Sequence, residues 1–204
     1  MKRPSIRLAP GQVDLTGTDR RYFNRGELEA LIHLIRSVEP KIVVEFGCNE
    51  GRAAAAILRN TPSIQSYVGI DVLSGYVTIQ KCQRREVPAD PGRLVRADPR
   101  FRLILRKRGS FDLTPADLPA CDAAFIDADH SRTGVRNDFA LAKAIVRPCG
   151  IIVFHDDNGL PVVEVTQTLD ELHAAGEAIT HVDDTWLAFM RVPSGAPAPF
   201  SFQP

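Results

Sequence analysis

Short apolar runs alternate with helical segments along most of this chain, and this alternation limits the possible folds more than any other feature. The runs are rich in β-branched residues and too short for helices, so they fit buried strands. They cover residues 41–46, 67–72, 101–105, 121–126 and 150–154. Strands that alternate with helices predict a mostly parallel sheet covered by helices on both faces.

The intervening segments carry helix signals. Asn24 and Glu27 have the spacing of a capping box, and Ser131 is placed to cap a later helix. The short turn 183–185 fits an antiparallel hairpin. We therefore expect helices over 28–38, 52–59, 76–84, 132–146 and 162–175, and closing strands over 178–182 and 186–192. The predicted fold is an α/β, Rossmann-like, doubly wound sheet of seven strands, mostly parallel, with an antiparallel last strand.

A chain of 204 residues fits one domain. Three parts are expected: an N-terminal arm over residues 1–24, the α/β domain over 25–192, and a Pro-rich flexible tail over 193–204.

The balance of charge argues against two classes of partner. Lys and Arg number 25, and so do Asp and Glu, so no global field attracts nucleic acid or an anionic membrane. The four cysteines are widely spaced and form no metal pattern, and no apolar run approaches the ~20 residues of a membrane span. We expect a cytoplasmic protein with no membrane partner. The sequence leaves open whether it forms a homo-oligomer.

The first strand ends in a glycine-containing turn. Residues 45–51 read Glu-Phe-Gly-Cys-Asn-Glu-Gly between a predicted strand and a predicted helix. Glycines let the backbone turn tightly and let a ligand approach the main chain. The dinucleotide pattern G-x-G-x-x-G is missing, and Glu45 and Glu50 would serve a pyrophosphate poorly. A ligand with an amino group and no phosphate fits better, although a plain strand-to-helix turn has the same glycines.

An acidic residue ends the second strand. Asp71 lies twenty residues after Gly51, where a carboxylate can accept hydrogen bonds from both hydroxyls of a ribose. Together with the glycine turn, Asp71 indicates a nucleoside-binding site.

These two features resemble class I S-adenosylmethionine-dependent methyltransferases, and the resemblance covers roughly residues 25–192. It implies that Glu45, Gly47, Asn49 and Gly51 line the methionine half of the cofactor and that Asp71 binds its ribose. Ser110 and Phe111 lie where the family contacts adenine, although many members have an acidic residue in place of Ser110. Asn49 replaces the usual third glycine. The family's acceptor pocket comes from variable segments, here residues 1–24, 73–100 and 158–165.

Motifs at the ends of the next two predicted strands indicate a narrower group of methyltransferases. Residues 125–130, Phe-Ile-Asp-Ala-Asp-His, resemble a stretch of metal-dependent O-methyltransferases and of related sugar and natural-product methyltransferases. The resemblance implies that Asp127 serves the cofactor site, catalysis and a metal. Residues 154–158 carry adjacent candidate ligands, and the metal pair is either His155/Asp156 or Asp156/Asp157. Such ligands suit Mg²⁺, Mn²⁺ or Ca²⁺, although acidic residues at strand ends also cap helices.

His130 is the candidate general base. It follows Asp127 by three residues, and the related families have Lys or His at this offset. An imidazole with its ordinary pKa of about 6.5 would be mostly neutral near pH 7. The alternative is that His130 only supports the loop.

The expected activity is O-methyl transfer from S-adenosylmethionine to a small molecule that carries a hydroxyl, with or without a divalent ion. Two rivals stay open. The basic segment 84–108 could present a macromolecular substrate, or the chain could keep the fold for binding or assembly without catalysis.

Overall fold

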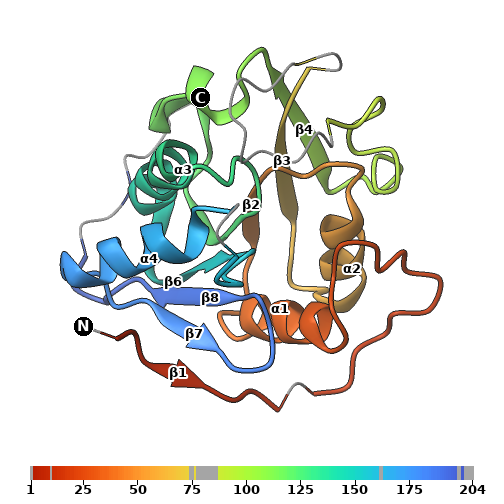
Figure 1. Ribbon diagram of the computed structural model, residues 1–204. Helices are drawn as coiled ribbons and strands as arrows, with labels where there is room; N and C mark the ends of the chain where they lie inside the picture. Colours follow the sequence, from red (N-terminus) through yellow and green to blue (C-terminus); the bar gives the residue numbers. More distant parts are fainter. Residues whose placement is uncertain are drawn as a thin grey trace.

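The protein is described as a computed structural model covering residues 2–9, 11–73, 76, 87–160, 163–196 and 199. Within these residues one mixed sheet runs through the molecule, with strand order β1-β7-β8-β6-β5-β2-β3-β4 (Figure 1). Its strands are β1 (Ser5–Ile6), β2 (Ile42–Phe46), β3 (Ser66–Val72), β4 (Phe101–Arg106), β5 (Cys121–Ile126), β6 (Val146–Phe154), β7 (Thr180–Val182) and β8 (Ala188–Arg191). β8 is antiparallel to both β6 and β7, and the other pairs are parallel.

In the described part of the chain, four α-helices cover the sheet: α1 (Glu27–Arg36), α2 (Arg52–Asn60), α3 (Arg132–Ile145) and α4 (Val165–Ala174). The apolar residues of α1 and α2 pack with Val43, Tyr67 and Phe125 in one core cluster. Those of α3 and α4 pack with the neighbouring residues Val44, Val68 and Ile126 in another. Because adjacent strand residues point to opposite faces, the two clusters lie on opposite sides of the sheet. The prediction of helices on both faces is confirmed.

Two short 3₁₀ helices, Gly109–Asp112 and Pro115–Asp117, connect β4 to β5. No helix in the described ranges is long and apolar enough to cross a membrane.

The sheet has one strand more than the seven predicted. Ser5 and Ile6 pair in parallel with His181 and Val182 at the edge of the sheet. Both residues of β1 are exposed, so no hydrophobic pattern marked them as a strand. Ion pairs from Arg3 to Asp157 and Asp170 hold this part of the arm in place.

Most other elements lie near their predicted bounds. β5 matches its predicted range, while the closing strands β7 and β8 are shorter than expected. Helix α4 begins at Val165 rather than at residue 162, which lies outside the described residues. The helix predicted over 76–84 also lies outside them, apart from Tyr76.

The topology brings four strand ends to one edge. Phe46 of β2 pairs with Ile70 of β3 and with Ile126 of β5, and Ile126 pairs in turn with Phe154 of β6. Beyond these pairs, the Asp127 N–H donates to the Phe46 carbonyl at 2.9 Å and the His155 N–H to the Ile126 carbonyl at 3.0 Å. The residues that follow these strands therefore start from fixed backbone positions beside one another.

Candidate active site

A cavity opens at this edge of the sheet. It is lined by residues that follow β2, β3, β4, β5 and β6, together with parts of the arm and of the segment after β3. The lining residues are Tyr22, Gly47, Asn49, Ile70, Asp71, Val72, Tyr76, Val87, Arg108, Gly109, Ser110, Phe111, Asp127, Ala128, Asp129, His130 and His155. The cavity thus contains most of the residues that the sequence singled out.

The glycine turn after β2 is shaped by close packing. Gly47 has a φ of +85°, and a Cβ atom there would lie 2.3 Å from the carbonyl oxygen of Asp127. Gly51 has a φ of +88°, and a Cβ there would lie 2.5 Å from Val95. Gly47 lines the cavity, but Gly51 does not. The position of Gly51 therefore does not support the expectation that it lines the methionine half of the site. Its lack of a side chain instead leaves room for Val95.

Asp71 is held at the floor of the cavity. Its carboxylate accepts the N–H of Asn49 at 2.6 Å and the N–H of Val72 at 2.7 Å. Burial raises the pKa of Asp71, and these two hydrogen bonds oppose the rise. A carboxylate has about four acceptor positions, so two remain for a ligand.

Glu45 lies behind the turn. Its carboxyl group is almost fully buried, accepts the hydroxyl of Tyr67 at 3.1 Å and is not among the cavity-lining residues. Burial, and then the negative charge of Asp127, raise the pKa of Glu45 well above its usual range. The expectation that Glu45 lines the methionine half of the site does not match this position.

A third buried acid supports the far side of the cavity. Ser110 donates a hydrogen bond from its hydroxyl to Asp138 and accepts one from Asn137 Nδ2 at 3.1 Å. Asp138 is fully buried in α3, and burial raises its pKa to about 7. Ser110 and Phe111 both line the cavity, and their contact with adenine stays a prediction.

A charged cluster also lines the cavity. Asp127, His130 and Asp156 each offer one ligand atom, and these atoms lie within 4.8 Å of one another. His130 Nε2 lies 2.7 Å from Asp156 Oδ2 and 3.7 Å from Asp127 Oδ1. Burial lowers the pKa of His130, but these two carboxylates outweigh it and raise the pKa to about 9. The expectation of a mostly neutral imidazole near pH 7 is therefore wrong for the protein without a bound ion.

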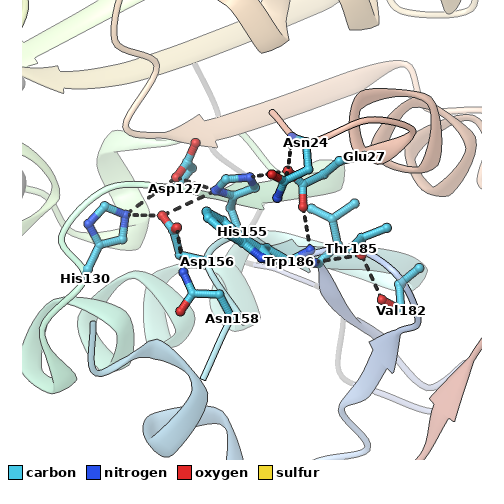
Figure 2. Close-up of polar contacts among 11 residues, drawn as sticks. Asn24, Glu27, Asp127, His130, His155, Asp156, Asn158, Val182, Thr185 and Trp186 are labelled. Atoms are coloured by element: carbon cyan, nitrogen blue, oxygen red, sulfur yellow. Dashed lines mark hydrogen bonds and ion pairs between the residues drawn. The ribbon is translucent and has the colours of Figure 1, made fainter. Parts of the chain in front are cut away.

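His155 joins this cluster from the end of β6. Its Nδ1 lies 3.3 Å from Asp127 Oδ1 and 3.3 Å from Asp156 Oδ2, and its Nε2 lies 3.4 Å from Glu27 Oε2 (Figure 2). Burial lowers the pKa of His155, but the charge of Asp127 and the other facing carboxylates raise it well above its usual range.

Asp157 is turned away from this cluster. Its two oxygens accept Arg3 NH1 and NH2, each at 2.8 Å, and Oδ2 lies 2.7 Å from His181 Nδ1. Burial raises the pKa of Asp157, but His181 and Arg3 outweigh it and lower the pKa to about 2. Of the two predicted ligand pairs, the structure places His155/Asp156 beside Asp127, and Asp157 anchors the N-terminal arm instead.

Comparison with known proteins assigns a family. A family model described as "Methyltransferase domain" matches residues 44–156, more than half of the chain. The chain belongs to this methyltransferase family. No curated protein matches it significantly.

Solved structures similar to this methyltransferase share its fold at low identity. Cofactor-bound Rv0187 from MTB is 18% identical with a TM-score of 0.60, over 86% of this chain and 83% of its own. The O-methyltransferase from Bacillus cereus in complex with SAH is 17% identical with a TM-score of 0.57, over 87% and 85%. The SAH-bound methyltransferase PaMTH1 from Podospora anserina is 16% identical with a TM-score of 0.59, over 81% and 77%. The predicted Rossmann-like methyltransferase fold is confirmed.

Two features of the methyltransferase site were not predicted as parts of it. The capping-box residue Glu27 is fully buried and reaches His155. Tyr22, from the arm, lines the cavity with a φ of +78°, and its ring stacks 5.3 Å from the guanidinium of Arg52. Arg52 also pairs with Asp19 at 2.8 Å, so the arm is fastened to the start of α2.

Part of the basic segment of the methyltransferase is paired with carboxylates in the described residues. Four of its arginines form ion pairs with nearby carboxylates. These pairs are Arg93–Glu50, Arg96–Asp90, Arg100–Asp98 and Arg108–Asp112.

Proposed function

We propose that this protein binds S-adenosylmethionine and transfers its methyl group to the hydroxyl of a small molecule. The observation that carries the proposal is a single cavity lined both by Asp71 and by the charged cluster of Asp127, His130 and His155, with Asp156 in contact with this cluster. Asp71 is suited to bind a ribose, and the charged cluster is suited to bind a hydroxyl that must lose its proton. Similar structures solved with a bound cofactor or with SAH support the same cofactor.

The cofactor would lie along the cavity. Asp71 has acceptor capacity left for the ribose hydroxyls. Ser110 and Phe111 would contact the adenine, and Gly47 and Asn49 the methionine end. This orientation directs the methyl group toward Asp127 and His130, which line the same cavity.

The transfer itself is a displacement. The acceptor oxygen forms a bond to the methyl carbon, the carbon–sulfur bond breaks, and the sulfur keeps the electron pair as a neutral thioether. The hydroxyl proton would go to Nε2 of His130, which requires that His130 be unprotonated when the acceptor binds. The protein supplies mainly orientation and charge in this reaction.

The residues present fit a divalent cation. Two carboxylates and one or two imidazole nitrogens meet there, a donor set that binds Mg²⁺ or Mn²⁺. Asp127 and Asp156 would hold the ion with His155 beside them, and Nε2 of His130 would then remain available to accept the proton. When bound, the ion would supply Lewis-acid polarisation of the acceptor hydroxyl. A cation on Asp127 and Asp156 would also weaken their hold on the proton of His130.

A small-molecule acceptor is favoured over a macromolecule because four arginines of the basic segment are already paired with nearby carboxylates. The cytoplasmic location, the absence of a membrane partner and any homo-oligomer stay proposals from the sequence.

The test is a methyl-transfer assay with labelled S-adenosylmethionine against pools of small hydroxyl compounds, RNA and protein. We expect label in the small-molecule pool, with loss of turnover in excess EDTA if the ion takes part. Label only in RNA or protein would overturn the small-molecule assignment. Full turnover in EDTA would show that the acidic cluster works without an ion.

A further inference from the structure

Glu27 is a fully buried carboxylate in the first turn of α1, close to the proposed acceptor end. Its Oε2 accepts the N–H of Asn24 at 2.9 Å, and its Oε1 accepts the N–H of Trp186. A buried carboxylate needs such partners, because an isolated charge in the protein interior is costly. Beyond the two backbone groups, Oε2 also faces the imidazole of His155.

We propose that Glu27 is a positioning residue that fixes the orientation of the His155 ring toward Asp127 and Asp156. The effect of Glu27 on turnover rests on the proposed function, whereas its effect on the orientation of the His155 ring does not. It assigns to Glu27 a role beyond that of a helix cap.

The geometry of His155 supports this role. One ring nitrogen faces Glu27, and the other faces the two carboxylates at the cavity (Figure 2). Rotation of the ring by half a turn would place C–H groups against all three carboxylates. Glu27 therefore favours one of the two ring orientations, as carboxylates behind metal-binding or catalytic histidines do.

Aromatic rings limit the tilt of His155. The ring of Phe23 meets it edge-on with centroids 5.4 Å apart, and those of Phe125 and Trp186 lie 6.3 and 6.5 Å away. Phe23 stands next to Asn24, whose N–H is bound by Glu27. By binding the N–H of Asn24, Glu27 helps to hold Phe23 beside the His155 ring. It also contacts the ring directly.

The test compares Glu27→Gln with the matched control Asp122→Asn. Asp122 also accepts two backbone N–H groups, from Lys41 at 2.7 Å and Ile42 at 2.9 Å, and faces one cation, Arg147. It lies at the start of β5, at the opposite end of that strand from Asp127. Each variant loses the charge of a carboxylate that accepts main-chain hydrogen bonds, but only the carboxylate of Glu27 contacts His155.

The first readout is ¹⁵N NMR of the histidine rings in the protein without ligand, with His155 assigned from a His155→Gln spectrum. Glu27→Gln should displace the His155 ring signals while those of His33 and His173 stay in place. Asp122→Asn should lower thermal stability and leave the His155 signals unchanged. If Glu27→Gln does not fold, Glu27→Asp, which keeps the charge but shortens the reach, should show the same displacement.

The second readout is kinetic, on the acceptor found in the transfer assay. Glu27→Gln should lower kcat about 10–100-fold, the usual effect of losing such a supporting carboxylate, with KM for S-adenosylmethionine within about twofold. Unchanged His155 signals in the Glu27 variants, or an equal displacement in Asp122→Asn, would overturn the proposal. If the parent does not bind S-adenosylhomocysteine, the proposed function fails, while the NMR result still decides the role of Glu27.

Discussion

The two ends of the cavity are built in different ways. The methionine and ribose part of the cofactor end comes from two consecutive strands, β2 and β3, and the turn after β2. Its shape depends on the backbone, with Gly47 against the Asp127 carbonyl and the Asn49 and Val72 N–H groups on Asp71. The acceptor end is built from charged side chains of segments far apart in the chain, with His155 in contact with both Glu27 and Asp127. Backbone geometry can be encoded locally, whereas a buried charge cluster requires the whole fold to bring its members together.

This difference predicts distinct responses to substitution. Changes at the acceptor end should affect the chemical step and spare cofactor binding. Changes in the glycine turn should affect cofactor binding and folding together, because the turn positions both ends.

The largest expected effect is that of His130→Ala on turnover. A general base contributes typically about 10²–10⁴-fold, so kcat should fall by this factor while S-adenosylhomocysteine binds normally. Because the pKa of His130 is raised to about 9, the proton-accepting form is populated only as the pH rises toward that value. Without a divalent ion, the kcat/KM of the parent should therefore increase with pH up to about 9. An ion on Asp127 and Asp156 should move this increase to lower pH, and His130→Ala should lack it in both conditions. A variant within a few-fold of the parent rate would assign His130 to structure.

Gly47→Ala should be the most damaging change at the cofactor end. The new Cβ would lie 2.3 Å from the Asp127 carbonyl oxygen, on a backbone that side chains rarely adopt. The free energy of unfolding should fall by about 3 kcal/mol or more, and S-adenosylhomocysteine binding should be lost. Both can be followed by urea unfolding and calorimetry.

Gly17→Ala is the matched control for this change. Gly17 has a φ of +67°, but a Cβ there meets nothing within 4 Å. It should cost only about 1 kcal/mol, with binding intact. Equal costs at the two positions would show that the contact with Asp127 is not what constrains the turn.

Asp138 is an exception at the cofactor end, because its buried side chain supports Ser110 through a hydrogen bond. Its pKa of about 7 in the folded protein lies above the ordinary value of 3.8, so the folded state binds more protons between these values. Stability from this group is therefore full below about pH 4 and is lost as the pH rises toward 7, by up to about 4 kcal/mol. In urea unfolding at pH 5 and pH 8, the parent should lose stability relative to Asp138→Asn. Parallel pH profiles for the two proteins would contradict this assignment.

The sequence predicted the cofactor end better than the acceptor end for the same physical reason. Hydrophobic periodicity located β5, and glycine spacing located the turn after β2, since both signals lie within a few neighbouring residues. Asp127 and Asp156 could be named from strand ends, but the choice between His155 and Asp157 required side-chain orientation. Asp157 turns to Arg3, 154 residues away in the chain, and no local pattern encodes that pairing.

Two further features escaped sequence analysis for related reasons. β1 is too short and too exposed to show a strand pattern, and main-chain pairing to β7 forms it. Glu27 did carry a capping-box signal, and its side chain does accept the Asn24 N–H. Its contact with His155, across 128 residues, has no sequence signature.

The most direct test of the account is calorimetry of S-adenosylhomocysteine and NAD binding to the parent and to Asp71→Ala. The parent should bind S-adenosylhomocysteine and show little affinity for NAD. Asp71→Ala should weaken S-adenosylhomocysteine by about 1–3 kcal/mol, because it removes a charged acceptor for the ribose hydroxyls. Asp117→Ala, at an exposed 3₁₀ turn that does not line the cavity, should bind like the parent. Tighter binding of NAD than of S-adenosylhomocysteine, or equal binding by Asp71→Ala and the parent, would contradict the account.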